Sequence, residues 1–391
     1  MINKKRSFIQ LISAIVIGVF GLLYYAYLKD LVDFRWFSLG DLNPYGGWSA
    51  IKASFMDLSY RWRGVTQSIA LSIAITGTSL FFGRLFCGYL CPVGALQDAF
   101  KAVGEKVGLT PIKLRKIGPF HLEWMKYGVL GALLVASVLE RGHYVSPYSP
   151  WLAYLNMFSG FSFGVGGVVL LVLVVGSLRT KRWFCRLLCP LGAFQALLYA
   201  LGPMKIKKTE SCEGCSACFK DCPVEIVNET EVISPECVNC LNCTQNNCHK
   251  GQTPYQTTIV GKKIKKGPYL AIGLSFFLML FVWLPFMAGP GQSSNAMVLE
   301  GLVDGVYHSN GTGFGGQIQV TVTISQQQIN QIQVVHHKET EGYYEEVFKA
   351  LSQEVINTQN LNVDTISGAT VTSRGFINAI RGGVGMGMPR E

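Results

Sequence analysis

Cys212-Glu-Gly-Cys215-Ser-Ala-Cys218-Phe-Lys-Asp-Cys222-Pro223 is the stretch of sequence that most narrows the fold, because it spaces four cysteines as C-x2-C-x2-C-x3-C before a proline. A tight turn with this spacing lets three thiolates surround one face of a 4Fe-4S cluster, while a fourth thiolate comes from elsewhere. A second run repeats the pattern with a last gap of four residues and His249 in place of the proline; its cysteines are Cys237, Cys240, Cys243 and Cys248. Two 4Fe-4S clusters are therefore expected between residues 205 and 255.

The spacing also predicts how the eight thiolates divide between the two clusters. In two-cluster proteins the fourth cysteine of each run ligates the cluster of the other run. We therefore assign two ligand sets: Cys212, Cys215, Cys218 and Cys248; and Cys237, Cys240, Cys243 and Cys222. Structural zinc would favour paired C-x2-4-C halves instead of triplets. None of the twelve cysteines lies beyond residue 248, which favours ligands on a reducing side of a membrane over disulfides.

The composition is that of a membrane protein. Of 391 residues, 49% are hydrophobic and only 15% are charged. Nucleic-acid binding is the usual interpretation of a net charge of +10, but here the basic residues flank apolar runs, as they do in membrane proteins. From residue 289 onward the balance reverses, with five lysines and arginines against nine aspartates and glutamates. We expect a lipid membrane as a partner and no nucleic acid.

Five apolar runs are candidates for transmembrane helices in an α-helical bundle: 8–28, 65–82, 124–139, 161–178 and 269–288. A bilayer core of ~30 Å takes about 20 helical residues. With five spans and a cytoplasmic N-terminus, the basic clusters fall on the cytoplasmic side. The cysteine-rich insert is then cytoplasmic, and the chain after residue 289 is extracytoplasmic.

An internal repeat links the second and the fourth run. RLFCGYLCPVGALQ at 84–97 shares its arginine, both cysteines, the proline and the final glutamine with RWFCRLLCPLGAFQ at 182–195. At i and i+4, the two thiols of each copy are expected on one face of a helix that the following proline disturbs. Both copies follow spans of the same predicted direction, so a parallel repeat would let four thiols converge; these are Cys87, Cys91, Cys185 and Cys189. Such a pocket suits an iron–sulfur centre, although Cu(I), zinc, a redox-active dithiol and simple packing are alternatives. Arg84 and Arg182 would either hold an anionic centre or extend to the headgroups.

The chain from 292 to 391 is expected to be a small α+β domain. Ile318, Val320, Val322 and Ile324 alternate with polar residues, which predicts a half-buried strand. A second strand is expected at 329–335, and helices are expected at 343–356 and 374–381. The polar segment 364–373 lies between these two helices.

This tail, from about 299 to 383, resembles the FMN-binding domain in the C and G subunits of the Nqr and Rnf electron pumps. In that family a flavin transferase esterifies the FMN phosphate to the last residue of D-x-x-S/T-G-A-S/T. The resemblance implies covalent FMN on Thr370 and a flavin transferase as maturation partner. It also implies cofactor contacts from the rest of the motif and from a nearby Lys-Glu-Thr segment: Asp364, Ser367, Gly368, Ala369, Glu339 and Thr340.

The two C-x3-C-P motifs and the two-cluster ferredoxin unit together are similar to the NapH and NosR families, membrane redox proteins of nitrate and nitrous-oxide respiration. The resemblance implies a multi-pass protein of the bacterial cytoplasmic (inner) membrane. NosR-type proteins carry an FMN-binding domain before the membrane spans, whereas here it follows them. The expected organisation is a transmembrane redox domain, a ferredoxin domain, a last transmembrane helix and an FMN-binding domain, at 1–204, 205–255, 266–288 and 292–391.

These features predict a membrane-bound oxidoreductase or electron-transfer component in which the cofactors, not a catalytic side chain, carry the chemistry. A cytoplasmic donor, reduced ferredoxin or a flavoprotein, would reduce the clusters, and electrons would reach FMN outside. FMN would then reduce an extracytoplasmic acceptor protein or small molecule. The alternatives are a quinol dehydrogenase of a respiratory chain and a NosR-like regulatory or maturation protein.

Overall fold

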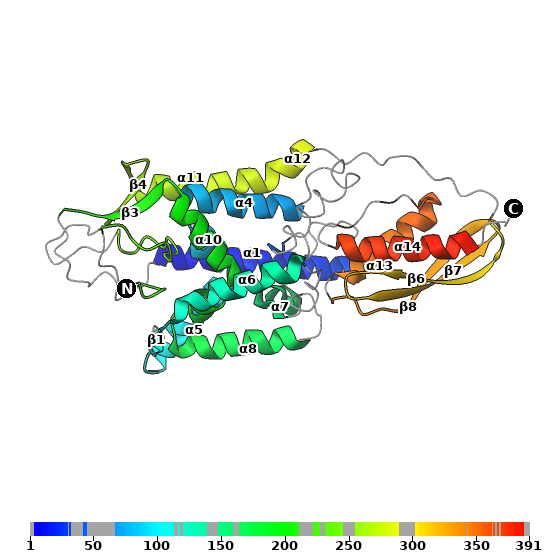
Figure 1. Cartoon of the computed structure of the whole chain (residues 1–391), viewed down its shortest axis with the longest axis horizontal. Coiled ribbons are helices and arrows are strands. Elements are labelled where there is room, and N and C mark those ends of the chain that lie inside the picture. The colour runs from blue at the N-terminus through cyan, green and yellow to red at the C-terminus, as the bar shows by residue number, and fades with distance from the viewer. Residues whose placement is uncertain are drawn as a thin grey trace. The chain divides into compact units, whose positions relative to one another are not determined.

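The computed structural model is drawn in Figure 1, and the described residues are 4–29, 31–32, 42–44, 67–112, 116–117, 120–138, 148–158, 164–210, 222–226, 231–244, 255–288, 302–341, 343–361, 363, 366 and 369–386. They divide into two compact units. The first comprises Met1–Val19, Ile73–Tyr154 and Gly164–Phe281, and the second comprises Phe20–Ser72, Leu155–Phe163 and Val282–Glu391.

Each of the five predicted apolar runs contains a helix: α1 (Lys4–Leu28), α4 (Gln67–Phe82), α6 (Met125–Val138), α8 (Gly164–Arg179) and α11 (Lys266–Leu278). The last of these continues as a π-helix, Met279–Trp283, and α12, Leu284–Ala288. Among the described residues, Lys5–Tyr27 and Lys266–Met287 are long and apolar enough to cross a bilayer. The other three helices have 16, 14 and 16 residues, about 21 to 24 Å at 1.5 Å per residue.

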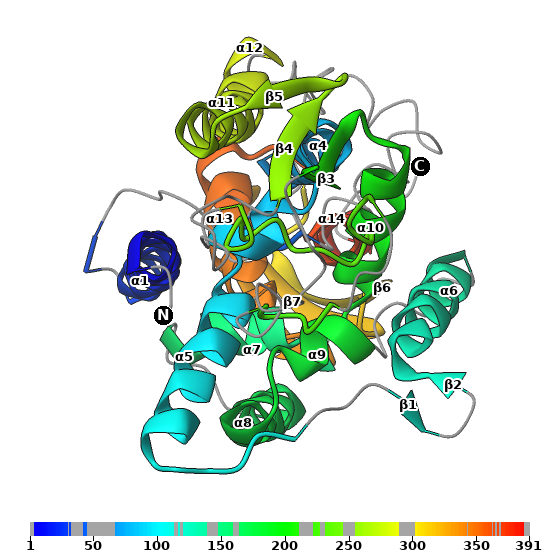
Figure 2. The same cartoon turned by 90° about the vertical axis from the view of Figure 1, so that its left-hand side faces the viewer.

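Helices α1, α4, α8 and α11 run roughly along one direction (Figure 1), and α1, α8 and α11 are seen nearly end-on in Figure 2. Their outward faces are apolar. On α8, Val168 is 60% exposed and Leu171 62% exposed. Large exposed apolar faces are costly in water, so these surfaces fit contact with lipid.

The two copies of the repeat fold alike. Phe86–Leu90 is one turn of π-helix followed by α5 (Pro92–Lys106), and α9 (Trp183–Leu187) is followed by α10 (Pro190–Leu201). In each copy the second cysteine is extended and caps the new helix, with ψ of 117° at Cys91 and 110° at Cys189. The expectation that both thiols of a copy share one helix face was therefore wrong. Proline has no N–H and a preset φ, so it begins a new helix here and does not merely disturb an existing one.

A small antiparallel sheet closes the cysteine-rich insert. Its order is β3 (Met204–Lys208), β4 (Tyr255–Ile259) and β5 (Lys262–Ile264). Met204 pairs with Ile259, and Lys208 pairs with Tyr255. The two ends of the predicted ferredoxin domain are therefore hydrogen-bonded to each other. A further short hairpin joins β1 (Lys116–Ile117) and β2 (Phe120–His121).

The C-terminal domain is α+β, as predicted. Strands β6 (Gly305–Thr312), β7 (Gln317–Ser325) and β8 (Gln328–His336) form an antiparallel sheet in sequence order. Helices α13 (Tyr344–Thr358) and α14 (Thr370–Met386) cover one face of this sheet (Figure 1). All four alternating apolar residues of β7 are buried, and the helices add Val347, Leu351, Phe376 and Ile380 to the core.

Two features of this domain differ from the sequence-based expectation. Strand β6 was not predicted, because its side chains alternate only between half-buried and exposed and include His308 and Asn310. Helix α14 begins at Thr370, four residues earlier than expected. The last four residues of the polar segment therefore form the first turn of the helix.

Candidate iron–sulfur and flavin sites

The structure brings the four cysteines of the repeat together. Cys87 and Cys185 are buried, and Cys91 and Cys189 are partly buried. The thiol of Cys91 lies near enough to interact electrostatically with all three others. No disulfide links them. The structure thus places all four repeat thiols within electrostatic range of one another, and their role as ligands of one centre stays a prediction.

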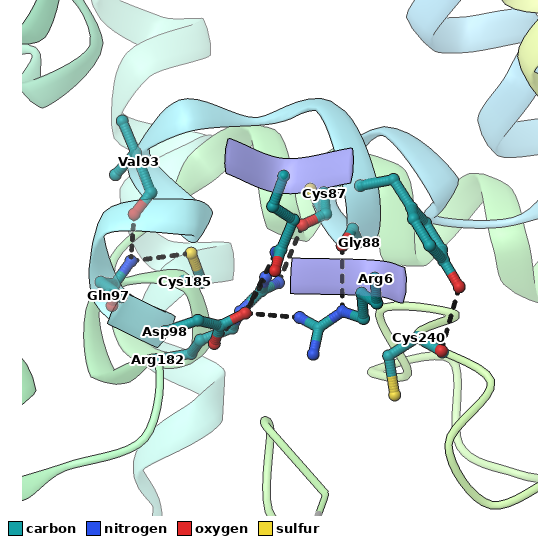
Figure 3. A network of polar contacts seen from close by, with 11 residues as sticks. Arg6, Cys87, Gly88, Val93, Gln97, Asp98, Arg182, Cys185 and Cys240 are labelled. Carbon is teal, nitrogen blue, oxygen red and sulfur yellow. Dashed lines mark hydrogen bonds and ion pairs between the residues drawn. The ribbon is translucent and has the colours of Figure 1, made fainter. Parts of the chain in front are cut away.

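Crossed contacts connect the two copies at this cluster. Gln97 Nε2 of the first copy lies 3.1 Å from the sulfur of Cys185 in the second (Figure 3). Gln195 Oε1 of the second copy lies 3.3 Å from the sulfur of Cys87 in the first. Each glutamine therefore contacts the first cysteine of the opposite copy. Comparing the sequences of the two copies shows that both glutamines are repeated. It does not show that each glutamine contacts the opposite copy.

The repeated glycines leave room for the repeated arginines. A Cβ placed on Gly94 would lie 3.3 Å from Arg182 Nη2, and one on Gly192 would lie 2.9 Å from Arg84 Nη2. Contacts this short are rare for real Cβ atoms. The guanidinium of each copy thus occupies space that a larger residue of the other copy would fill.

Both repeated arginines are buried, with exposures of 1% for Arg84 and 0% for Arg182. Arg182 donates to both carboxylate oxygens of Asp98, at 2.9 and 2.7 Å, and to the carbonyl of Cys87 at 2.8 Å (Figure 3). Arg6, from α1, pairs with the same carboxylate and donates to the carbonyl of Gly88 at 3.2 Å. Both guanidinium groups are therefore enclosed by protein. They place positive charge beside the sulfur cluster.

Glu236 connects the ferredoxin segment to this region. Its carboxylate pairs with Arg84 at 3.2 Å and with buried Lys126, and accepts a hydrogen bond from Tyr127 Oη at 2.6 Å. Burial by itself would raise the pKa of Glu236, but Arg84 and Lys126 together lower it below its ordinary value. The carboxylate is therefore ionised at neutral pH. Sequence reasoning missed Glu236 and Asp98, because a single acidic residue carries no signal of its distant partner.

Four cysteines of the ferredoxin segment are described: Cys222, Cys237, Cys240 and Cys243. Electrostatic interactions join Cys222 to Cys240 and Cys237 to both, so the structure brings Cys222 to the second run. The assignment of Cys222 to the cluster of the second run stays a prediction. The remaining predicted ligands, Cys212, Cys215, Cys218 and Cys248, lie outside the described residues.

The loop between these cysteines has a backbone suited to an anionic centre. Asn239 and Leu241 have φ of 49° and 58°, in the left-handed region. Alternation of this kind turns successive N–H groups to one side, a geometry common at iron–sulfur sites. Burial raises the pKa of the Cys222 thiol to about 11. At neutral pH this sulfur is thus ionised only when a metal centre binds it.

The same loop packs directly against the first C-x3-C-P motif, residues 87–92, which is called the first membrane motif below. Tyr89 Oη donates a 3.0 Å hydrogen bond to the carbonyl of Cys240. A Cβ on Gly88 would lie 2.3 Å from the carbonyl oxygen of Val238, so only glycine fits there. Asn239 Nδ2 donates to the carbonyl of Phe82 at 2.8 Å. The second cysteine run and the first C-x3-C-P motif are therefore in van der Waals contact.

The surroundings of the four repeat cysteines, called the membrane thiols below, fit a thiolate-bound cluster; these are Cys87, Cys91, Cys185 and Cys189. Thiolates are soft ligands that suit iron–sulfur centres. Among the described residues, two buried donors beside them have no hydrogen-bond partner, Gln195 Nε2 and Arg84 Nε. Unpaired buried donors are costly, and an anionic centre would accept from them. No three histidine, cysteine, aspartate or glutamate side chains in the described part of the chain are grouped to hold a single metal ion.

In the C-terminal domain, buried Glu339 joins three segments of the predicted flavin site. Its Oε2 accepts from Thr372 Oγ1 at 2.5 Å, and its Oε1 accepts from the N–H of Gly315 at 2.9 Å. Gly375 packs on the same glycine-rich loop, where its Cβ would lie 2.6 Å from Gly313. Glu339 thus fixes the loop after β6 to the first turn of α14.

Thr370 begins α14, a helix of 17 residues. The N–H groups of a helix N-terminus favour a phosphate. Ala369 is buried and Thr340 is half-buried. The side chain of Thr370 and the residues Asp364, Ser367 and Gly368 lie outside the described set.

Family comparisons agree with both halves of this description. An FMN-binding domain model matches residues 313–384. A 4Fe-4S binding domain model matches 66–110 and 163–209, each of which contains one copy of the repeat. The chain belongs to the ferredoxin-type membrane proteins of the NapH/NosR kind and carries an FMN-binding domain. It therefore combines 4Fe-4S binding and FMN-binding domains in one chain.

Three relatives illustrate the family. The chain is 30% identical over 215 residues to the putative electron transport protein YccM of Escherichia coli, covering 51% of this chain and 60% of that protein. It is 33% identical over 158 residues to the methylamine utilization ferredoxin-type protein MauN of Paracoccus denitrificans, covering 39% and 51%. It is 28% identical over 255 residues to the regulatory protein NosR of Pseudomonas aeruginosa, covering 61% and 34%. The chain thus spans less than two thirds of each.

Proposed function

We propose that this protein carries electrons across the bacterial cytoplasmic membrane. A cytoplasmic donor, reduced ferredoxin or a flavoprotein, supplies electrons to the two 4Fe-4S clusters of the ferredoxin segment. A further iron–sulfur centre at the four repeat cysteines receives them, and FMN covalently bound at Thr370 passes them to an extracytoplasmic acceptor. The observation that carries the proposal is the direct contact between the Cys237–Cys243 loop and the first membrane motif, made by Tyr89 and Cys240.

This contact gives the clusters an order. The loop that carries Cys237, Cys240 and Cys243 contacts the first C-x3-C-P motif, so in this proposal the cluster assigned to these cysteines and Cys222 is the exit cluster of the ferredoxin segment. The cluster assigned to the first run is then the entry point. Iron–sulfur clusters exchange one electron at a time, whereas flavin exchanges one or two, so FMN can serve either kind of acceptor.

The charged residues around the membrane thiols favour a negatively charged centre there. Arg182 and Arg6 share the single carboxylate of Asp98, and Arg84 and Lys126 share that of Glu236. Cationic groups therefore outnumber anionic ones in this buried network. Surplus positive charge stabilises a thiolate-bound centre in a medium of low dielectric constant.

The C-terminal domain holds the flavin at the first turn of α14. Thr370 is the predicted ester site, and the helix N-terminus stabilises the phosphate. Glu339, bonded to Thr372 and Gly315, keeps the glycine-rich loop in place. A flavin transferase attaches the cofactor during maturation.

The proposal is tested with purified protein in detergent, under anaerobic conditions and without quinone. Reduced ferredoxin is added, and bleaching of the flavin absorbance is followed. We expect bleaching in the unmodified protein and none in Cys185→Ser. Bleaching that requires added quinol would identify a quinol dehydrogenase instead. Bleaching by neither donor would favour a regulatory role, the function in the name of the NosR relative.

A further inference from the structure

We propose that Gln97 and Gln195 are positioning residues that each donate a side-chain amide N–H to the first cysteine sulfur of the opposite repeat copy and thereby set the reduction potential of the membrane centre. The inference rests on the proposed presence of an iron–sulfur centre at these sulfurs. It assigns to two residues of the repeat a role that their sequence does not reveal.

The orientation of the Gln97 amide follows from its two partners. Its Oε1 accepts from the backbone N–H of Phe184 at 3.2 Å, which leaves Nε2 facing the sulfur of Cys185 at 3.1 Å. Nε2 also reaches the carbonyl of Val93 at 3.4 Å (Figure 3). The side chain is fully buried. Gln97 therefore directs an N–H at Cys185 and can present no acceptor to it.

Gln195 occupies the matching place in the second copy. Its side chain is also fully buried, with Oε1 at 3.3 Å from Cys87 Sγ and Nε2 lacking any partner among the described residues. The two amide atoms have nearly the same shape, so a half-turn of the amide exchanges them. A thiolate sulfur accepts and cannot donate, so in the loaded centre the N–H faces Cys87. This turn also pairs the otherwise unpaired donor.

The arrangement predicts the direction in which these N–H donors shift the reduction potential of the proposed centre. An N–H donor withdraws charge from sulfur, which favours the reduced and more negative state of a cluster and raises its potential. With the Gln195 amide turned, both first cysteines receive one such donor, whereas Cys189 faces the backbone N–H of Gly192 at 3.4 Å. Of the repeated polar side chains, only the glutamines direct a neutral donor at a sulfur. The arginines bond carbonyls and carboxylates.

The test is a redox titration of the full-length purified protein, taking as the membrane centre the signal that is absent from Cys185→Ser. Gln97→Leu removes the N–H donor to Cys185 without placing a charge beside the sulfur atoms. Gln195→Leu removes the donor of the other copy. We expect a more negative midpoint in each, with a roughly tenfold change in the reduction equilibrium, equivalent to 59 mV for one electron. The control is Ser177→Ala, which deletes a buried hydroxyl that bonds the carbonyl of Leu173 and should leave the midpoint unchanged.

A second measurement needs no substitution. Glutamine labelled with 15N in the side-chain amide should show hyperfine coupling to the reduced membrane centre in pulsed EPR. Coupling together with the negative shifts supports the proposal. An unshifted midpoint in both variants, or no amide coupling, overturns it. Absence of iron at the four cysteines would instead refute the proposed cofactor, so the two failures are distinguishable by metal analysis.

Discussion

Tyr89 Oη lies 3.0 Å from the carbonyl oxygen of Cys240, and this hydrogen bond joins the membrane motif to a predicted cluster ligand. Tyr89 is two residues from Cys87 and is 1% exposed. The bond therefore lies between two sets of sulfur atoms in a region that excludes water.

Replacing Tyr89 with phenylalanine should slow electron transfer without removing either centre. The variant leaves a buried carbonyl unpaired, which costs about 1–3 kcal/mol and loosens the contact between the loop and the motif. We expect unchanged iron content and a several-fold slower bleaching of the flavin by reduced ferredoxin in stopped-flow absorbance. Tyr154→Phe is the control, because that hydroxyl bonds the carbonyl of Ala14. Equal rates in Tyr89→Phe and Tyr154→Phe would contradict the assigned path.

Glu236→Gln should destabilise the first unit strongly. The substitution leaves Arg84 and Lys126 buried without their shared carboxylate, and breaking a buried pair in this way costs about 3–5 kcal/mol. The free energy of unfolding, measured by denaturant titration in detergent, should fall by this amount. Glu105→Gln provides the comparison, because its pair with Lys101 is 51% exposed on the glutamate side and should change stability by under about 1 kcal/mol. Similar losses in both variants would argue against a structural role for Glu236.

Alanine at Gly192 should remove iron from the membrane centre more completely than alanine at Gly94. The new Cβ would lie 2.9 Å from Arg84 Nη2 in the first case and 3.3 Å from Arg182 Nη2 in the second, so the displacement is larger at Gly192. Iron and sulfide analysis of the purified variants checks the order. Gly128→Ala on α6 has open space around the Cβ and should retain full iron content. A normal iron content in Gly192→Ala would contradict the proposed packing.

Thr370→Val should abolish flavin that survives denaturation, whereas Thr372→Val should keep it. Thr370 supplies the proposed ester oxygen, but the Thr372 hydroxyl bonds Glu339. Loss of that buried hydrogen bond should instead lower the stability of the C-terminal domain by about 1–3 kcal/mol. Flavin fluorescence on a denaturing gel and thermal unfolding of the two variants measure these outcomes. Covalent flavin in Thr370→Val would show that the ester lies elsewhere.

Part of this structure follows from the sequence for clear physical reasons. The alternation in β7 predicts its buried face, because strand side chains alternate with period two. The duplicated motif predicts that Cys87 and Cys185 converge, because equivalent segments of a parallel repeat meet at its axis. The helix boundaries within the repeat are harder to predict from the sequence. Pro92 and Pro190 each start a new helix, whereas the i, i+4 spacing of the cysteines predicts one continuous helix through both.

Other features depend on contacts that no local pattern encodes. Asp98 and Glu236 each bind two cationic side chains from distant segments, and a single carboxylate in a sequence does not identify its partners. Strand β6 carries few apolar residues, but it pairs with β7 along its whole length and packs against α14, where Ser309 donates to the carbonyl of Ala379. The early start of α14 was missed because Thr370, Thr372 and Ser373 have weak helix propensity. The buried bond from Thr372 to Glu339 outweighs that preference.

The most direct measurement uses the protein sealed in vesicles with the ferredoxin segment facing the added donor. A membrane-impermeant reductant is supplied on that side, and the oxidation state of the flavin on the opposite side is followed by absorbance. The proposed conduit predicts flavin bleaching in the unmodified protein without quinone, and none in Cys185→Ser. Flavin that stays oxidised while the ferredoxin clusters are fully reduced would contradict electron transfer across the membrane.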